Sequence, residues 1–481
     1  MNINSTASDI LRIYLLVVAL LVFQTSMAQQ CSNLQPNLIS ELTMDCASIP
    51  LSMIHDSRGL PYLFVANKDA GFRVIDLTDS DNPNQVAEIP VSDLGNLHVM
   101  NLCQNGNMLL LALGNHFSSP QQAGIAAIDI TNPASPQLSD YLIIENSESG
   151  AGIVSTEGEY AYLGAMKSGL VIIDLTDLNN LQEVSRIVPD INYPVNNPSN
   201  VDLYNARGMV VENDIVYLCF DAGGLRIINC TNKVNPVETG RYANPALFVP
   251  FNLPRAYNNV VKNGNLLYVA VDYCGVEVLD ISDTSAISLS GWWNPYDCPG
   301  NNWFTSPVHA NEIRYLSDCA TLLVSTGKSD MYVLDVSTAT QPDSCGIFGG
   351  TDNNIGTWGV NYSGNEIYLS YICTLGIPFA SNWSGIKLLS TQNCNPSAIK
   401  HSEKLNASVF PNPANSEVHI QLNKYFEADL FLFNAHGEML DQIRFKGNNL
   451  SINTLETYSA GLYFYMIKAK EKSISGKFII Q

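Results

Sequence analysis

A short sequence pattern repeats along most of this chain. An aromatic or aliphatic run is followed by a glycine, an apolar run, an Asp and a polar turn. Clear copies of its second half are Gly71–Asp76 (GFRVID), Gly169–Asp174 (GLVIID) and Gly275–Asp280 (GVEVLD). A repeat of this kind means that one supersecondary unit is stacked many times, so it constrains the fold more than any single residue does.

The pattern occurs seven times. The residues that end the apolar run are Asp76, Asp129, Asp174, Asn229, Asp280, Asp335 and Ser390. From residue 76 to residue 390 there are six intervals, which gives a mean period of about 52 residues. This period is near the upper end of those known for propeller repeats.

Each unit contains four short segments with the character of β-strands. In the fourth copy they cover residues 206–211, 215–220, 224–229 and 237–242. They are rich in β-branched and aromatic residues and are bounded by Gly, Asn, Asp or Pro. No segment of useful length has a helical period. Four antiparallel strands per unit, repeated radially, predict an all-β protein with the fold of a β-propeller.

The seventh unit lacks its fourth strand, because no strand-like segment follows Ser390 directly. Residues 34–42, at the other end of the repeat region, have the missing character of a proline followed by a strand. An N-terminal strand that completed the last blade would close the ring and remove two open sheet edges. We therefore predict a seven-bladed propeller of four-stranded blades, closed by an N-terminal strand.

The repeat resembles that of the propeller family named for the LVIVD motif. The phrases Leu170–Asp174, Phe72–Asp76 and Leu225–Asn229 carry the resemblance, which spans roughly residues 34–395. We assign residues 29–398 to this propeller. The resemblance implies a fold, but members of the family lack a shared, well-defined activity.

The first 28 residues are expected to be a secretory signal peptide. Arg12 supplies a positive charge, residues 15–23 form a short apolar core, and Ser26–Ala28 offers a small-residue cleavage site. The apolar core is too short for a transmembrane span. A Gln precedes Cys31 where a lipoprotein requires a small residue, so we do not expect lipidation.

The last eighty residues differ from the rest. Residues 401–481 contain as many basic as acidic side chains, so the net charge of −21 belongs to residues 1–400. Alternating short strands near residues 418–422, 430–434, 461–467 and 476–480 predict a small β-sandwich. We place this domain at residues 409–481, after a linker at residues 399–408.

This tail resembles the type A sorting domain of the type IX secretion system of Bacteroidetes. The matching parts are Phe410–Pro413 (FPNP), Gly461–Phe464 (GLYF) and a last strand with Gly476 and Lys477. The resemblance implies export across the outer membrane, with the secretion machinery as a partner of the tail. It also implies a protein that is secreted or held at the outer cell surface.

Composition excludes several partners. Only 14% of the residues are charged, and the net charge is −21. Such a chain repels nucleic acid and anionic lipid, so we expect no nucleic acid partner, and no segment is suited to span a membrane. No calcium-binding loop and no CxxC or His-rich spacing is present, so we expect neither a metal nor a cofactor.

Eleven cysteines, all before the tail, fit an oxidising compartment. Strand order places alternate loops of a blade on the same face, which brings certain cysteines within reach of one another. The expected pairs are Cys31–Cys394 across the closure seam, Cys46–Cys373, Cys274–Cys298 and Cys319–Cys345. Cys103, Cys219 and Cys230 are left over.

The recurring Asp and Gly are interpreted as turn residues. A short polar side chain just before a turn accepts a hydrogen bond from its own backbone. The glycine before the apolar run supplies a positive φ angle.

Binding is expected on the face that carries the second-to-third and fourth-to-first strand loops, because several of these loops are long. They cover residues 114–124, 190–205, 243–257, 294–308 and 374–385, and their aromatic residues include Phe117, Phe248, Phe251, Phe304 and Phe379. The candidate binding residues on this face or in the channel are His98, His116, Arg207, Arg255, Trp303, His309 and Trp383.

Catalytic motifs are missing: there is no Gly-x-Ser-x-Gly elbow, His-Glu-x-x-His pair or phosphate-binding loop, so we name no catalytic residue. The leading hypothesis is a non-catalytic binding or adhesion propeller with a glycan or protein ligand. One alternative is a hydrolase or lyase that acts on an extracellular polysaccharide. The other is a structural surface component, which would show no pocket of ligand size.

Overall fold

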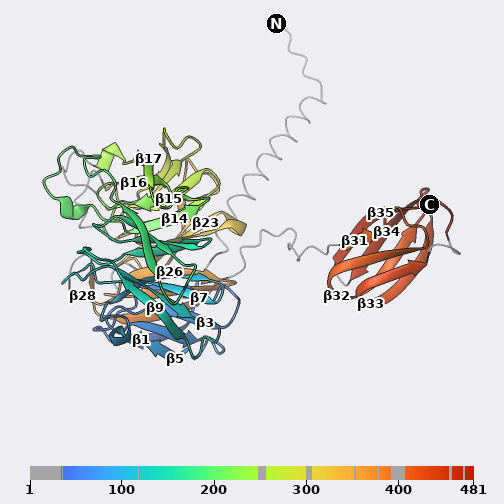
Figure 1. The fold of residues 1–481 in the computed structure, drawn as a ribbon, viewed down its shortest axis with the longest axis horizontal. Coiled ribbons are helices and arrows are strands. Elements are labelled where there is room, and N and C mark those ends of the chain that lie inside the picture. Colours follow the sequence, from blue (N-terminus) through green and yellow to red (C-terminus); the bar gives the residue numbers. More distant parts are fainter. Residues whose placement is uncertain are drawn as a thin grey trace, which may run out of the picture. The chain divides into compact units, whose positions relative to one another are not determined.

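The computed structural model describes residues 34, 36–117, 119–247, 256–298, 306–350, 354–375, 379–391, 407–453, 458–469 and 472–481. The chain divides into two compact units, Met1–Pro396 and Ser397–Gln481. Figure 1 labels the strands of each unit. The predicted signal peptide, residues 1–28, lies outside the described residues and stays a prediction.

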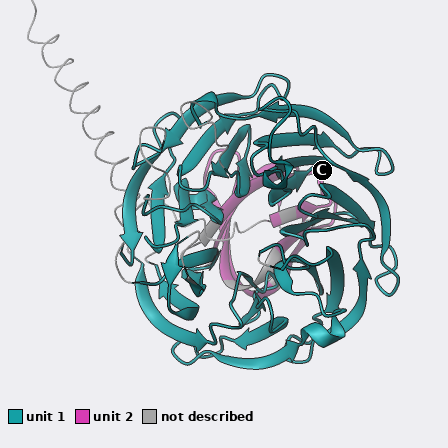
Figure 2. Ribbon diagram, turned by 90° about the vertical axis from the view of Figure 1, so that its left-hand side faces the viewer, with its two compact units in different colours: residues 1–396 teal, residues 397–481 magenta. Residues whose placement is uncertain are grey.

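The first unit is a seven-bladed β-propeller, as the repeat predicts (Figure 2). Each blade is a four-stranded antiparallel sheet. The first three blades are β2 (Ser52–His55), β3 (Tyr62–Ala66), β4 (Phe72–Asp76) and β5 (Asn84–Ile89); β6 (Val99–Asn105), β7 (Met108–Leu113), β8 (Gly124–Asp129) and β9 (Gln137–Ile143); and β10 (Ile153–Glu157), β11 (Tyr160–Gly164), β12 (Leu170–Asp174) and β13 (Gln182–Ile187).

The next three blades have the same order. They are β14 (Gly208–Glu212), β15 (Ile215–Cys219), β16 (Leu225–Asn229) and β17 (Val237–Tyr242); β18 (Asn259–Asn263), β19 (Leu266–Ala270), β20 (Val276–Asp280) and β21 (Ser288–Trp293); and β22 (Ile313–Leu316), β23 (Thr321–Ser325), β24 (Met331–Asp335) and β25 (Asp343–Phe348). The strands of the fourth blade lie within two residues of the expected ranges.

The seventh blade closes the ring in the predicted way. Its strands are β26 (Thr357–Ser363), β27 (Glu366–Tyr371), β30 (Ser384–Ser390) and, as the outermost strand, the N-terminal β1 (Asn37–Met44). β1 pairs antiparallel with β30, from Asn37 opposite Ser390 to Met44 opposite Ser384. The short hairpin of β28 (Thr374–Leu375) and β29 (Ala380–Ser381) precedes β30.

Apolar side chains between neighbouring blades form the core. One cluster of buried residues fills each of the seven spaces between blades, for example Leu110 with Val171 between the second and third blades. The cluster that contains Met53 and Leu388 joins the seventh blade to the first. The innermost strands β2, β6, β10, β14, β18, β22 and β26 follow one another around the central axis.

The recurring Asp residues cap turns, which confirms their structural interpretation. The Asp174 carboxylate accepts a hydrogen bond from the Thr176 backbone N–H at 2.8 Å. The same bond to the residue two positions later is made by Asp76, Asp129, Asn229, Asp280 and Asp335. Hydrogen bonds from the side chains of Thr131 and Thr176, and then from their backbone N–H groups, lower the pKa of Asp129 and Asp174. The Ser282 backbone N–H does the same for Asp280. The repeated carboxylate is therefore explained by the turn.

We predict that Gly169→Ala lowers the free energy of unfolding by about 2 kcal/mol. Gly169 has a φ of +75°, and an added Cβ would lie 2.1 Å from the Ile187 carbonyl oxygen. Gly158 in the same blade has a φ of +61° with no atom within 4 Å of its Cβ position. Gly158→Ala should therefore cost only about 1 kcal/mol, from the backbone angle alone. Urea unfolding compares the two, and equal losses would contradict the steric part of the argument.

The second unit is a five-stranded antiparallel sheet. Its strands are β31 (Ala407–Phe410), β32 (Glu417–Phe433), β33 (Met439–Asn453), β34 (Gly461–Ala469) and β35 (Lys472–Ile480). The pairing of the two long strands β32 and β33 shifts register between Gln421 and Phe426. Ala414, which follows β31, bridges to Ile480 on β35, so the sheet wraps around one core that contains Val418, Leu430 and Phe478.

Candidate functional site

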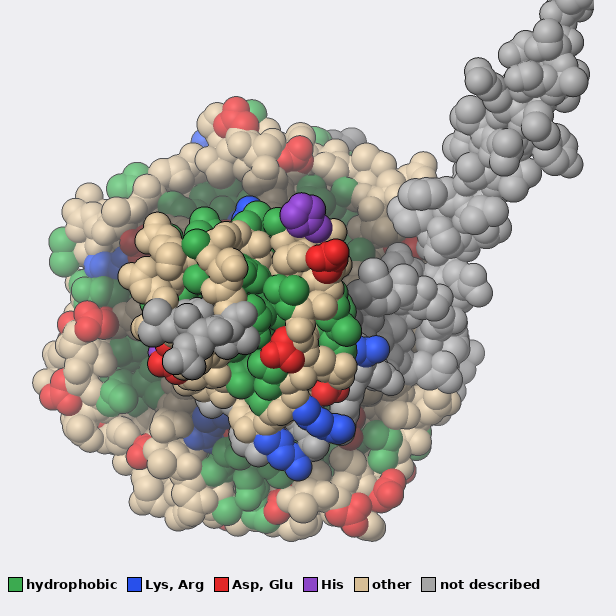
Figure 3. Space-filling view, turned by 90° about the vertical axis from the view of Figure 1, so that its right-hand side faces the viewer, with side chains coloured by type: hydrophobic (Ala, Val, Ile, Leu, Met, Phe, Trp, Pro, Cys, Tyr) green, Lys and Arg blue, Asp and Glu red, His purple; other side chains and the backbone are tan. Residues whose placement is uncertain are grey.

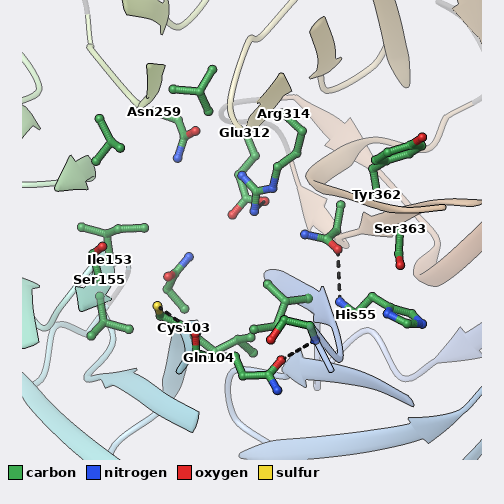
Figure 4. Close-up of a pocket in the computed structure, with 18 of the residues that line it drawn as sticks. His55, Cys103, Gln104, Ile153, Ser155, Asn259, Glu312, Arg314, Tyr362 and Ser363 are labelled. Carbon is green, nitrogen blue, oxygen red and sulfur yellow. Dashed lines mark hydrogen bonds and ion pairs between the residues drawn. The ribbon is translucent and has the colours of Figure 1, made fainter. Parts of the chain in front are cut away.

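A cavity of about 520 Å³ lies in the central channel of the propeller (Figure 4). All seven innermost strands contribute to its wall. Representative residues are Ile54, Asn101, Ile153, Val210, Asn259, Arg314 and Asn361, one from each strand. The cavity extends to Ser57 and Gly59, which belong to the connection between β2 and β3. It therefore reaches the face opposite to the long loops on which the sequence placed the binding site.

Arg314 of β22 and Glu312, which directly precedes this strand, bring charged groups to the cavity (Figure 4). The Glu312 side chain is 7% exposed; one carboxylate oxygen accepts from Ser52 Oγ at 2.9 Å and the other from the Val360 N–H at 3.2 Å. Burial raises the pKa of Glu312, and the nearby Arg314 guanidinium opposes this change. Arg314 Nη2 lies 3.7 Å from Glu312 Oε2, so the two charges compensate each other.

Amide side chains continue this polar side of the wall. Asn361 Oδ1 accepts from the His55 N–H at 3.1 Å, and Gln104 Oε1 accepts from the Ser57 N–H at 2.8 Å. Asn101 is 6% exposed, and its Oδ1 has no hydrogen-bond partner within the part of the chain that the structure describes. Asn101 also lines the smaller chamber described below, so either a ligand or a water molecule that donates to this oxygen would remove the cost of leaving it unpaired.

The other side of the wall is mainly aliphatic. Ile153 and Ser155 lie on the side of the cavity away from Tyr362 and Ser363 (Figure 4). Val210 and Val261 come from the two strands that follow around the ring, and both line the cavity. Ser155 and Asn259 add polar groups here, so this side is mainly aliphatic and carries no charged side chain, whereas Glu312 and Arg314 lie on the other side.

A much smaller chamber of about 40 Å³ lies where the innermost strands begin. All seven blades contribute to its wall, with Leu51, Met100, Gly152, Arg207, Asn258, Asn311 and Trp358 beside His116. Asn101, Ile153, Asn259 and Glu312 line both this chamber and the larger cavity. The amides tie blades together, since Asn258 Nδ2 donates to the Ala310 carbonyl and Asn311 Nδ2 donates to the Trp358 carbonyl. A water molecule occupies about 30 Å³ of liquid, so this chamber is too small for an organic ligand.

Two predicted site residues, His116 and Arg207, meet at this chamber. Burial, with a smaller contribution from the Arg207 charge, lowers the pKa of His116 to about 3. His116 is therefore neutral at physiological pH, and its ring packs on Phe117 with centroids 4.5 Å apart.

His309, another predicted site residue, belongs to a buried group beside the chamber. Its Nε2 lies 2.8 Å from Asp272 Oδ1, and its ring stacks on Trp358 with centroids 6.1 Å apart. Tyr273 and Phe379 contact the same ring edge-on. These contacts leave His309 only 6% exposed. His309 therefore belongs to the packed interior at this end of the channel and not to an open binding surface.

Asp221, like Asp272, is a buried carboxylate at this end of the channel. Burial raises its pKa to about 6, while the Arg207 charge and a hydrogen bond from Asn205 at 2.9 Å oppose the rise. The backbone of Asp221 also bridges to Tyr257 of the next blade.

The remaining predicted residues do not line either cavity. His98 Nδ1 lies 2.7 Å from Asp69 Oδ1, and burial lowers the pKa of His98. Trp383 packs edge-on against Tyr371 and donates to Thr43 Oγ1 of β1 at 3.4 Å, so it supports the closure seam. Arg255 and Trp303 lie outside the described residues, as do Phe248, Phe251 and Phe304.

The sequence interpretation missed the residues of the larger cavity. Glu312 and Arg314 are the charged residues of an otherwise apolar and aromatic segment, Glu312–Leu316. Alternate residues of a strand share one face, and the first strand of each unit lies innermost. Charged residues two positions apart in a first strand are therefore a signal that could have located this wall.

Two of the expected disulfide bonds are present. Cys46 is bonded to Cys373 and Cys274 to Cys298, with Cα–Cα distances of 5.2 and 5.0 Å. Cys319 and Cys345 are each disulfide-bonded, and their pairing with each other stays a prediction. The proposed pair Cys31–Cys394 lies outside the described residues. Cys103, Cys219 and Cys230 carry free thiols.

No group of three or more His, Cys, Asp and Glu side chains suited to a metal ion occurs within the ranges that the structure describes. Over the same ranges, none of the helices has the length and apolar character needed to cross a bilayer. Figure 3 shows acidic side chains at separate places rather than gathered in one patch.

Comparison with known families agrees with both parts of the fold. The LVIVD repeat model matches residues 150–188 and 255–294, which fall in the third and fifth blades. The model of the secretion system C-terminal sorting domain matches residues 408–481, the second unit. The chain thus carries LVIVD repeats in a β-propeller, followed by a sorting domain of the type IX secretion system. This combination defines a protein that is secreted or attached to the outer surface, and the sorting domain implies contact with the secretion machinery.

Solved structures share the architecture only distantly. Sqt1 of Saccharomyces cerevisiae is 10% identical, with a TM-score of 0.47 over 92% of this chain and 99% of that one. The computationally designed Ika8 protein is 8% identical, with a TM-score of 0.44 over 74% and 100%. PorZ, described as a surface component of the type IX secretion system of Porphyromonas gingivalis, is 11% identical, with a TM-score of 0.34 over 88% and 64%. No curated protein matches the chain in sequence. None of these likenesses assigns a function.

Proposed function

We propose that this protein is a non-catalytic binding propeller, delivered to the cell exterior by its tail, and that its ligand occupies the channel cavity. The observation that carries the proposal is the cavity of about 520 Å³ with wall residues from all seven innermost strands. Its volume is within the range of small-molecule sites, and a rigid scaffold surrounds it. A purely structural surface component would need no such cavity.

Filling the cavity should abolish binding. Val210 lines the cavity from β14, so we predict that Val210→Trp reduces the affinity for the cavity ligand by at least about tenfold. Val237, on the outer strand of the same blade, is 50% exposed, and Val237→Trp adds the same side chain away from the channel. The measurement is a screen of wild-type protein and both variants against glycans, peptides and small metabolites, read by calorimetry.

The screen distinguishes the alternatives. Ligands lost in Val210→Trp but kept in Val237→Trp support the proposal, provided that both variants keep the wild-type unfolding midpoint. Ser155→Phe gives a second, smaller obstruction from β10 if the Trp variant unfolds. Binding that neither cavity variant changes would contradict the channel site. Turnover of any glycan or peptide would overturn the non-catalytic assignment in favour of a hydrolase or lyase.

A further inference from the structure

We infer that the channel cavity recognises a neutral, hydroxyl-rich ligand such as a mono- or disaccharide, through Glu312, Arg314 and Asn101. The inference rests on the proposed binding function and names the chemical class of the ligand.

The charges of the cavity wall point to a neutral ligand. Glu312 and Arg314 lie 3.7 Å apart, and Asp56, the other carboxylate of the lining, pairs with Arg58, so each charge of the wall already has a partner. A charged ligand would pair with one of them and leave the other uncompensated in a partly desolvated site, which is unfavourable. A neutral ligand leaves the pair intact and uses its remaining hydrogen-bonding capacity.

The same side chains offer both donors and acceptors. The Arg314 guanidinium has five N–H donors, one of which is given to the Ile313 carbonyl at 2.9 Å. Each Glu312 oxygen accepts one bond from the protein and can accept another. Asn101 lines both this cavity and the small chamber, and its buried Oδ1 has no partner among the described residues, so a hydroxyl that reaches it would satisfy it. A hydroxyl group donates and accepts at once, and neighbouring hydroxyls therefore match this mixed set.

The opposite side of the wall matches the rest of a sugar ring. Ile153, Val210 and Val261 present aliphatic surface on the three strands that contribute no charged residue to the wall, beside the polar Ser155 and Asn259. A pyranose has hydroxyls at its edge and C–H groups on its faces, so it can place each against the side of like polarity. A free amino acid also has polar and apolar groups that could contact the two sides of the wall. Its carboxylate and ammonium groups, however, would have to compete with the Glu312–Arg314 pair.

The test uses the full secreted protein and defined probes. Binding of neutral sugars (glucose, galactose, mannose, N-acetylglucosamine and their disaccharides) is measured by ligand-observed NMR and calorimetry. Glucuronic acid, glucosamine and leucine serve as the acidic, basic and zwitterionic comparisons. We expect at least one neutral sugar to bind, with each charged comparison at least about tenfold weaker.

Variants connect the binding to the named residues. Arg314→Met and Glu312→Gln should each weaken the bound sugar by at least about tenfold, and Arg314→Lys should restore part of the affinity. Lys262 also carries a cation on an inner strand but pairs with Glu212 away from the cavity, so Lys262→Met is the matched control and should bind as wild type. Arg314 is partly exposed, so its variants remain informative if Glu312→Gln fails to fold.

Other results would overturn the inference. These are equal or tighter binding of a charged comparison, sugar binding that Arg314→Met does not change, or no binding of any neutral sugar. In the last case a different ligand that is lost in Val210→Trp would still support the proposed function. The absence of any ligand lost in that variant would contradict both.

Discussion

Replacing Cys46 and Cys373 with serine is expected to lower the free energy of unfolding by about 4 kcal/mol. This bond joins the segment after β1 to the segment after β27, across 327 residues of chain. β1 is the strand that completes the seventh blade, so the bond holds the ring closed at its seam. A cross-link over a loop this long removes more conformational freedom from the unfolded chain than a short one does.

The bond between Cys274 and Cys298 is the matched control, because it spans only 24 residues within the connections of one blade. Its double serine variant should lose about 2 kcal/mol. Guanidinium unfolding of the oxidised proteins, followed by tryptophan fluorescence, measures both. Equal losses for the two pairs, or no loss for the long one, would show that the first bond does not govern ring closure.

The fold could be predicted from the sequence because its signals are local. The glycine and the capping Asp of each copy lie within a few residues of the turn that they form, as Gly169 and Asp174 do. Counting copies then exposed the missing fourth strand, and β1 pairs with β30 as that count required. Closure was predictable because the seventh unit lacked a fourth strand, and residues 34–42 had the character of that missing strand.

The site was less predictable because it depends on residues about fifty positions apart that converge on one axis. Glu312 directly precedes the short strand that contains Arg314, the neighbouring residues are apolar or aromatic, and no local motif marks the pair. The aromatic loop residues attracted attention instead, yet Phe379 is 2% exposed and is buried with Trp358 of β26. They pack around His309 rather than form an open binding platform. Which long-loop residues become buried cannot be read from loop length.

Glu277→Gln is expected to stabilise the protein above neutral pH. Glu277 on β20 is fully buried, and its carboxylate accepts from Asn244 Nδ2 at 2.7 Å and from the Tyr257 hydroxyl at 2.9 Å. Burial raises its pKa from 4.5 to about 7, although both hydrogen bonds favour the charged form. A folded-state pKa above the unfolded value gives stability that is complete below about pH 4.5 and is lost as pH rises through about 7. The loss corresponds to about 3 kcal/mol.

The glutamine variant cannot ionise, so its free energy of unfolding relative to wild type should rise between about pH 4.5 and 7 and then level off. We expect a gain of about 2 kcal/mol at pH 8, less than the full 3 kcal/mol because the amide nitrogen cannot accept the Tyr257 bond. Urea unfolding at pH 5 and pH 8 measures the difference.

The control is Glu88→Gln, which removes the same charge from an outer strand where the side chain is 51% exposed. Its effect on the free energy of unfolding should be near zero at both pH values. If the difference in free energy of unfolding between wild type and Glu277→Gln does not change with pH, Glu277 stays ionised in the folded protein. The Asn244 and Tyr257 hydrogen bonds would then outweigh the cost of burying the charge.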